Sequence, residues 1–564
     1  MRNYMEIMEG YCKDILSGRI VSGTYTRKAV KRHVNDMEAS RRGTSPWTFD
    51  AEAASRLCAF AESLRPPDLL GKPLVLLPWQ VFCLSSLEGW RYRDEPDRKR
   101  FRSAYIEVNR KNGKTSGILM PMTLFNFLKY QACESYLVSS RDDLSEKTFG
   151  EISAIIKADP SLDSLLACRS LAVTFKEPGE GSRLSFFCDG GKSVDGFRPR
   201  FFCIDEYHEY ATDKIVESMR MGMRSKRDAQ GVIITTADAN VAVPCYEQNL
   251  KARRILNGVQ AQEDFFAIIY ALDEGEDYHD QSVWQKANPS MPDIIDPSVI
   301  QSDIDDAELT PHKIPELKAK TFGIWGGGGE HSWIPVEVWQ KNRTSPDWES
   351  LEGCDAFGGL DLSQIDDMTA FTLCFRSGSD RVFRHRFYIP EGTLSARYRK
   401  ENANFMGWVE RGIVTAIPGD TIDYGFIVRD ILADAERYRI RGIGYDRWQS
   451  RDVISAVEEA RPDIALIEVE QSLKKLSPLT KSYEKLVRDG HLVDPNPVML
   501  WMINNVTVKP DANGNYKPLK SSKASTQRID GVVSSIMAYA VSENELFAGP
   551  AEKPMDFDTL MEFI

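Results

Sequence analysis

Residues 103–115 read Ser-Ala-Tyr-Ile-Glu-Val-Asn-Arg-Lys-Asn-Gly-Lys-Thr, an apolar run that passes into a polar loop and a Gly-Lys-Thr triplet. The apolar run predicts a buried β-strand, and the residues from Ser116 onward predict a helix. A strand, a tight loop and a helix start together gather backbone N–H groups and a lysine around a phosphate group. The stretch therefore predicts a phosphate-binding loop in an α/β domain with a sheet of the parallel type.

This loop supplies the residues expected to bind ATP with Mg²⁺. The Lys114 ammonium would reach the terminal phosphates, and the Thr115 hydroxyl would hold Mg²⁺. Val108 stands where the usual pattern has its first glycine, so the pattern is imperfect. The sequence predicts an N-terminal P-loop NTPase domain whose ATP-binding residues include Arg110, Asn112, Gly113, Lys114 and Thr115.

Residues 77–80, upstream of the loop, read Leu-Pro-Trp-Gln and leave two interpretations open. Either Gln80 contacts the edge of the adenine ring of ATP, or the segment starts a helix with Trp79 buried. An arginine that stabilises charge on the γ-phosphate is also expected. The candidates are Arg91, Arg93 and Arg110. The sequence does not choose among them, because a neighbouring subunit can supply such an arginine.

Two further apolar runs predict strands that end in polar residues. Residues 201–206 read Phe-Phe-Cys-Ile-Asp-Glu. Asp205 is predicted to orient Mg²⁺, and Glu206 to polarise the water that attacks the γ-phosphate. The alternative is a core strand whose end is solvated by acids. Residues 231–236 end in two threonines, at a position where motor ATPases detect the γ-phosphate.

A second pattern begins beyond Cys354, where three successive strands precede alternating helices and strands. Asp361 lies within the first strand, where an acid is unfavourable unless it is paired or binds a metal. Asp446 ends a later strand and Asp530 begins the last helix; the simpler alternatives are a strand-end turn and a helix N-cap. Acids in this order fit an RNase H-like nuclease that holds two divalent ions, Mg²⁺ or Mn²⁺, about 4 Å apart. The predicted catalytic residues are Asp361, Asp446 and Asp530, and Asp367 is a further predicted metal ligand.

These patterns divide the chain into five predicted segments. They are 1–60, a helical N-terminal region; 61–325, the P-loop ATPase domain; 326–353, a glycine-rich linker; 354–545, the C-terminal RNase H-like nuclease domain; and 546–564, a flexible tail. The linker begins with four consecutive glycines, which are typical of a flexible joint.

The charge of the chain is unevenly distributed. Its 564 residues include 83 acids and 71 bases, for a net charge of −12, which argues against a protein that coats nucleic acid. However, residues 264–310 hold twelve acids and one base, so the rest of the chain carries only −1. Residues 471–530 hold ten bases and five acids. These basic side chains are predicted to contact DNA phosphates without reading the nucleobases, and a merely solvated face is the alternative.

Composition also indicates the compartment. The ten cysteines form no Cys-x-x-Cys pair, which is typical of a reduced cytosolic protein. No apolar stretch approaches the ~18 residues of a membrane helix, and the N-terminus lacks the apolar core of a signal peptide. We expect a soluble intracellular protein without a membrane partner.

Together, these motifs resemble the large terminase subunit of tailed double-stranded DNA bacteriophages, over about residues 60–545. The resemblance is carried by Asn109-Arg-Lys-Asn-Gly-Lys-Thr115, Ile204-Asp-Glu206, Thr235-Thr236, Gly359-Leu-Asp-Leu-Ser363, Asp367-Met-Thr-Ala370, Asp446, Asn496-Pro-Val-Met-Leu-Trp501, Asn504-Asn505 and Arg528-Ile-Asp530. The residue Val108 is similar to the family's own deviant phosphate loop. Val493-Asp494-Pro495 stands where the family often has a His-Gly-Gly segment, so no role is carried over to it.

The resemblance implies a viral DNA-packaging motor. Its ATPase would drive double-stranded DNA through the portal protein into the procapsid, and its nuclease would cut concatemeric DNA. A small terminase subunit would select the cutting site. The family forms a homo-oligomeric ring on the portal and is often monomeric in isolation. We therefore expect the protein in the host cytoplasm and not in the mature virion.

Two other functions stay open at this point. A cellular helicase-nuclease would use the same two sites on a different substrate. A packaging scaffold component would carry the nuclease acids as a vestige, and the intact set of carboxylates argues against it.

Overall fold

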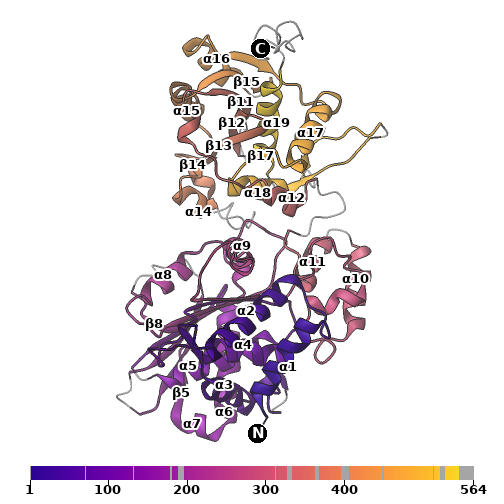
Figure 1. Cartoon of the computed structure of the whole chain (residues 1–564). Helices are drawn as coiled ribbons and strands as arrows, with labels where there is room; N and C mark the ends of the chain where they lie inside the picture. Colours follow the sequence, from indigo (N-terminus) through magenta and orange to yellow (C-terminus); the bar gives the residue numbers. More distant parts are fainter. Residues whose placement is uncertain are drawn as a thin grey trace, which may run out of the picture. The chain divides into compact units, whose positions relative to one another are not determined.

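The structure is a computed structural model, and it divides into two compact units, Met1–Gly329 and Glu330–Ile564 (Figure 1). It describes residues 2–69, 72–130, 132–177, 181–188, 196–310, 313–326, 333–362, 368–394, 405–447, 450–511, 513–520, 528–544 and 546. Three of the four linker glycines, and all of the predicted tail except Leu546, lie outside these residues.

The first unit is built on an eight-stranded sheet with the order β10-β3-β9-β8-β4-β7-β6-β5. Its strands are β3 (Ser103–Glu107), β4 (Glu134–Ser139), β5 (Leu166–Arg169), β6 (Ala172–Phe175), β7 (Arg183–Cys188), β8 (Pro199–Asp205), β9 (Gln230–Thr235) and β10 (Phe265–Ile269). The strands from β10 to β7 are parallel, and β6 and β5 add an antiparallel edge. The predicted parallel-type sheet is confirmed. Because β3, β9 and β8 are adjacent and parallel, their polar carboxyl ends meet at one edge.

The N-terminal helices pack within this unit and protect the free edge of β10. The helices are α1 (Tyr4–Ser17), α2 (Thr24–Arg41), α3 (Ala51–Ser63), α4 (Pro78–Gly89), α5 (Met120–Lys129), α6 (Asp142–Ala158), α7 (Pro160–Leu165), α8 (Lys214–Gly222), α9 (Pro244–Leu256), α10 (Pro297–Glu308) and α11 (Ile314–Phe322), with a ribbon of β1 (Trp47–Phe49) and β2 (Trp90–Tyr92). Thr26 donates a hydrogen bond to Ile269 O at 2.8 Å, and Arg32 donates one to Phe265 O at 2.9 Å. These bonds occupy carbonyl groups that an unprotected edge would offer to another strand.

The acidic stretch 264–310 runs from β10 to α10 and has a small apolar core. That core consists of Leu272, Trp284, Ala287, Met291, Ile295, Ile300 and Ile304, packed with Phe322 of α11. Several acids of the stretch are used locally. Asp280 and Asp296 cap helices through their side chains, and Asp273 accepts a hydrogen bond from Lys286 at 2.9 Å. Part of the concentrated negative charge therefore stabilises the local fold.

The second unit has a sheet with the order β14-β13-β12-β11-β15-β16, and β17 pairs with β13. Its strands are β11 (Asp355–Asp361), β12 (Thr369–Ser377), β13 (Asp380–Pro390), β14 (Val414–Ile417), β15 (Arg439–Tyr445), β16 (Ala465–Glu468) and β17 (Leu492–Val493), with a separate ribbon of β18 (Val506–Thr507) and β19 (Leu519–Lys520). Strands β13, β12 and β11 are antiparallel, and β15 and β16 continue parallel to β11. This mixed order confirms the predicted RNase H-like fold.

The central helix of this unit is α19, which packs against β11 and β12 (Figure 1). The helices are α12 (Val336–Gln340), α14 (Phe405–Glu410), α15 (Tyr424–Arg437), α16 (Arg451–Ala460), α17 (Leu473–Arg488), α18 (Pro497–Asn505) and α19 (Asp530–Ser542). Nearly every residue of α19 is buried. In the part of the chain that the structure describes, no helix combines the length and the apolar character needed to cross a bilayer.

A glycine allows α19 to lie directly on β11. A Cβ atom added at Gly359 would lie 2.0 Å from Ser534 O and 2.5 Å from Ala538 N. Both neighbours are backbone atoms, so the helix itself would have to move. The glycine therefore fixes how closely α19, with Asp530 at its start, approaches the strand that carries Asp361.

We expect Gly359→Ala to lower the free energy of unfolding by about 2 kcal/mol or more, because over-packing displaces backbone as well as side chains. Denaturant-induced unfolding measures this change. Gly150→Ala is the control, since a Cβ atom at Gly150 on α6 meets nothing within 4 Å. A Gly359→Ala protein as stable as the wild type would contradict the tight helix–strand contact.

Candidate functional site

The phosphate loop has the backbone strain that a tight anion-binding turn requires. It leaves β3 with the Val108 N–H bonded to Thr235 O at 3.0 Å. Lys111 and Gly113 have left-handed φ angles of 66° and 75°. A five-residue π-helix, Thr115–Leu119, follows the buried Lys114. Non-glycine residues with positive φ and short π-helices are both concentrated at functional sites.

The loop is braced by the segment 287–290, which the sequence did not connect with it. Asn109 donates a side-chain hydrogen bond to Ala287 O at 2.8 Å. Asn112 donates one to Asn288 Oδ1 at 3.0 Å and accepts one from Ser290 N at 3.1 Å. The predicted ATP-binding residue Asn112 thus holds the shape of the loop with its side chain.

Gln80 contacts the phosphate loop directly. Its Oε1 accepts a hydrogen bond from Leu77 N at 2.9 Å, and its Nε2 donates one to Gly113 O at 3.1 Å. Trp79 is buried at the start of α4 and donates to Ser290 Oγ at 2.9 Å. The segment therefore starts a helix, as one of the two interpretations held, and Gln80 joins that helix to the loop.

The two acids at the end of β8, Asp205 and Glu206, face the phosphate loop. Lys114 Nζ forms an ion pair with Glu206 Oε1 at 2.7 Å. Glu206 has a left-handed φ of 48°, and its N–H donates to Asp205 Oδ1 at 3.0 Å. Burial, followed by the neighbouring Glu206 charge, raises the pKa of Asp205 to about 7. A cation beside Asp205 would offset both of these costs.

The three candidate arginines have different surroundings. Arg91 is buried and pairs with Glu88 at 2.8 Å. Arg93 donates to the carbonyl groups of Ser40 at 2.9 Å and Ser45 at 3.1 Å. Arg110 is exposed on the phosphate loop itself. Among the three, Arg110 lies where it can reach a bound phosphate.

Sequence reasoning missed three residues of this site: His208, Asp238 and Lys320. Burial and the positive charges of Lys320, Lys114 and Arg110 lower the pKa of His208. Lys320 on α11 forms an ion pair with Asp238. His208 lies two residues after Glu206, and Asp238 two residues after Thr236, so their closeness to the motifs could have indicated both. Nothing in the sequence indicated Lys320.

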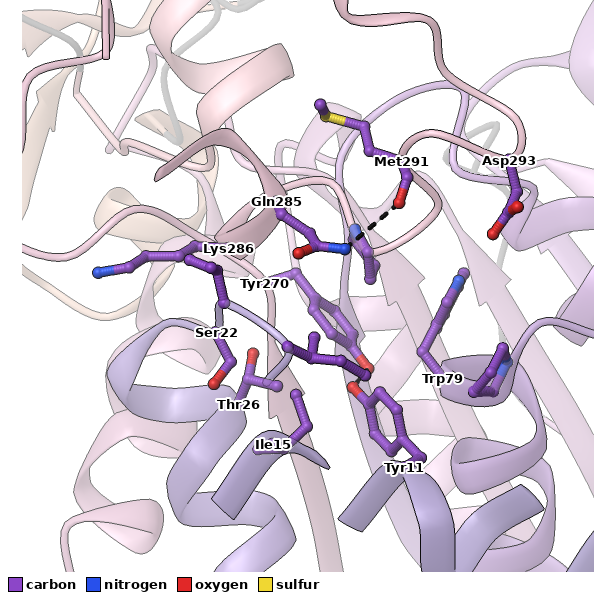
Figure 2. Close-up of a pocket in the computed structure, with 14 residues that line it drawn as sticks. Tyr11, Ile15, Ser22, Thr26, Trp79, Tyr270, Gln285, Lys286, Met291 and Asp293 are labelled. Carbon is purple, nitrogen blue, oxygen red and sulfur yellow. Dashed lines mark hydrogen bonds between the residues drawn. The ribbon is translucent and has the colours of Figure 1, made fainter. Parts of the chain in front are cut away.

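A cavity of about 110 Å³ lies beside Trp79, the residue next to Gln80 (Figure 2). Its walls include Tyr11, Trp79, Tyr270, Met291 and Asp293. The hydroxyl groups of Tyr11 and Tyr270 lie 3.1 Å apart. Aromatic rings with a few polar groups suit a flat heterocyclic ligand.

The three nuclease candidates of the second unit converge. Leu360 on β11 pairs in register with Tyr445 on β15, so Asp361 and the following Asp446 lie at the same edge of adjacent strands. Burial raises the pKa of Asp361, and the negative charges of Asp530 and Asp446 raise it further. The structure thus brings the three acids together from two strands and α19. Asp367, the fourth predicted ligand, lies outside the described residues.

The chemistry of this donor set fits divalent cations. Carboxylate oxygens suit Mg²⁺ and Mn²⁺, and three of them in a partly buried site repel one another unless a cation intervenes. Among the residues that the structure describes, no group of three or more His, Cys, Asp or Glu side chains is arranged so that it could hold a metal ion.

Basic and polar groups connect to this site. The charge of Lys520 and a hydrogen bond from the Gln471 side chain lower the pKa of Asp361 and so oppose the neighbouring carboxylates, which raise it. Lys517 donates to Gln471 O at 2.8 Å. Strands β18 and β19 pair as a hairpin, and Gly514, with φ of 72°, lies between them.

Both regions of the chain match known families. Residues 78–254 match the family model of the terminase large subunit, ATPase domain, and residues 259–545 match that of the terminase large subunit, endonuclease domain. The chain belongs to the terminase large subunit family. The terminase endonuclease match begins before the end of the first compact unit at Gly329.

Individual proteins are also similar to the chain. The large terminase subunit of Enterobacteria phage HK97 is 24% identical over 506 residues, which cover 87% of this chain and 94% of that protein. Protein YmfN of Escherichia coli (strain K12) is 28% identical over 357 residues, covering 61% and 77%. The crystal structure of the HK97 bacteriophage large terminase covers 86% of this chain and 98% of its own, at 20% identity and a TM-score of 0.45.

Membership of the terminase family establishes the activities. The chain is an ATPase and an endonuclease of phage DNA packaging, and its partners are DNA and the packaging machinery. The assignment favours this function over a cellular helicase-nuclease and over a scaffold with a vestigial nuclease.

Proposed function

We propose that Lys114, Thr115 and Asp205 bind Mg²⁺–ATP and that Glu206 activates the attacking water. The observation that carries this proposal is the 2.7 Å contact between Lys114 Nζ and Glu206 Oε1. It joins the phosphate loop to the end of β8, as γ-phosphate hydrolysis requires. Lys114 neutralises phosphate charge, Thr115 and Asp205 hold the metal ion, and Glu206 accepts the proton of the water.

The remaining predicted contacts complete this ATP site. Arg110 and Gly113 lie on the loop and contact the phosphates, and Arg110 is the candidate for γ-phosphate charge within one subunit. Asn112 and Gln80 hold the loop from behind. The aromatic cavity beside Trp79 accommodates the purine ring.

In the second unit, Asp361, Asp446 and Asp530, together with Asp367, hold two divalent ions, Mg²⁺ or Mn²⁺. Bound ions of this kind activate water and stabilise the leaving oxygen of the DNA backbone. The support for this proposal is that β11 and β15 bring Asp361 and Asp446 to one edge. In addition, burial, followed by the negative charges of Asp530 and Asp446, raises the pKa of Asp361. Basic residues of α17 and of the β18–β19 hairpin contact DNA phosphates.

The wider assembly follows from the packaging function. The chain works with the portal protein, the procapsid and a small terminase subunit, as a homo-oligomeric ring on the portal in the host cytoplasm. The ATPase domain spans 61–325 after the helical region 1–60, and the nuclease domain spans 354–545, after the linker 326–353.

Removal of divalent cations tests both sites together. With excess EDTA, we expect ATP hydrolysis and plasmid cleavage each to fall by about 100-fold or more, because a metal ion contributes several kcal/mol at each site. Phosphate release and agarose-gel conversion of supercoiled plasmid measure the two activities. Both should return when excess Mg²⁺ or Mn²⁺ is added, and an unchanged melting temperature is the control. Cleavage that persists in EDTA would refute the two-ion site.

A further inference from the structure

His208 lies in the short 3-10 turn Tyr207–Glu209 that follows β8, and its side chain is buried. Its Nδ1 is 3.3 Å from Glu206 Oε2. The same nitrogen is 3.2 Å from Thr235 Oγ1 and 3.2 Å from Thr236 Oγ1. The Nδ1 atom therefore lies within 3.3 Å of the Glu206 carboxylate and of the hydroxyl groups of Thr235 and Thr236.

The backbone of His208 adds a second connection to β9. Its N–H donates to Thr235 Oγ1 at 3.0 Å. This bond fixes the turn just after Glu206, whose left-handed φ of 48° is costly for a residue with a side chain. The other imidazole nitrogen, Nε2, is farther from its acidic neighbours, at 3.9 Å from Asp238 Oδ2 and 4.0 Å from Glu209 Oε1. The short contacts of the ring are thus made by Nδ1.

We propose that His208 is a positioning residue that fixes the Glu206 carboxylate relative to Thr235 and Thr236. The proposal rests on the proposed role of Glu206 in ATP hydrolysis. Lys114 approaches one carboxylate oxygen and His208 the other. When Lys114 turns to a phosphate group, His208 keeps Glu206 in place against the end of β9. The group that activates water and the hydroxyl groups beside the γ-phosphate position then move as one unit.

Two conservative substitutions distinguish this role from simple core packing. In His208→Asn the side-chain amide occupies the position of Nδ1, whereas in His208→Gln it occupies that of Nε2. We expect the kcat of ATP hydrolysis to fall about 10- to 100-fold in His208→Ala and His208→Gln, because a misplaced catalytic group costs on this scale. We expect His208→Asn to lose less than about 5-fold. The Kd of a fluorescent ATP analogue with Mg²⁺ should change by less than about 3-fold in all three.

Control variants make the outcome decisive. His279→Ala removes an exposed histidine of the same unit, paired with Asp277 and Glu308, and should hydrolyse ATP at the wild-type rate. In a double-mutant cycle, His208→Ala with Thr236→Val should cost no more than the larger single loss, because the two residues act through one contact. Melting temperatures identify any variant that is not folded.

Several results would overturn the proposal. Equal activities of His208→Asn and His208→Gln would show that Nδ1 is not the working atom. Additive losses in the double-mutant cycle would exclude a shared contact with Thr236. Parallel losses of kcat, ATP affinity and melting temperature would assign His208 to the core alone. By contrast, a Glu206→Gln protein that hydrolyses ATP at the wild-type rate would remove the proposed role of Glu206 itself, whatever the His208 variants do.

Discussion

Glu206→Gln is expected to lower the rate of ATP hydrolysis by about 10²- to 10⁴-fold while leaving metal-dependent DNA cleavage largely intact. The amide cannot accept the proton of the attacking water, and general-base catalysis contributes on this scale. Cleavage should survive because its carboxylates lie in the other compact unit. Phosphate release in the presence of DNA and a plasmid-nicking assay measure the two activities in the same preparation.

Glu217→Gln is the matched control for this variant. Glu217 is exposed on α8 in the same unit, so the same chemical change there should leave both activities at the wild-type level. If folded Glu206→Gln lost both ATP hydrolysis and cleavage, the two sites could not be independent, and the division of labour proposed for the two units would be wrong.

Asp361→Asn is expected to reduce DNA cleavage by about 100-fold or more and to leave ATP hydrolysis unchanged. Loss of a residue that merely supports a metal ligand already costs about 10- to 100-fold, so loss of a ligand should cost at least as much. Burial and the charges of Asp530 and Asp446 raise the pKa of Asp361, which means that a charged carboxylate is unfavourable at this position. The uncharged asparagine removes this cost. The variant should therefore unfold at the wild-type temperature or above it. Plasmid cleavage in Mg²⁺ and Mn²⁺, together with thermal unfolding, measures both effects.

Asp355→Asn provides the comparison on the same strand. Asp355 lies at the opposite end of β11 and pairs with Arg439 at 2.5 Å, away from the carboxylate set. The Asp355→Asn protein should cleave DNA at the wild-type rate. An inactive Asp355→Asn protein that is still folded, or an active Asp361→Asn protein, would contradict the placement of the nuclease site.

The strands that carry the motifs could be predicted because each is an apolar run that ends in a polar group. The sequence indicated β3, β8, β9, β11 and β15 in this way. It did not indicate the edge strand β10, although Phe265–Ile269 is continuously apolar. A short apolar run has no periodicity that separates strand from helix, so only its parallel pairing with β3 identifies it.

The sites were predictable to the extent that their residues stand at strand ends. Glu206, Asp361 and Asp446 belong to that class, and Lys114 was found because it stands at the start of the helix after the phosphate loop. The brace at 287–290 and the contact of Lys320 do not, because both depend on pairing with residues far away in the sequence. Asn112 shows the same limit. An asparagine is a suitable residue for a phosphate loop, but its hydrogen-bond partner, Asn288, lies 176 positions away and could not be predicted.

The packing of α19 on Gly359 has a consequence for the order in which the protein is made. Asp361 and Asp530 are separated by 169 residues, and both are needed in the carboxylate set. At roughly 5–20 residues per second, the ribosome releases α19 some tens of seconds or less after β11, and until then the strand has no covering helix. The carboxylate set therefore cannot close before α19 has been synthesised, whereas the phosphate loop is synthesised long before.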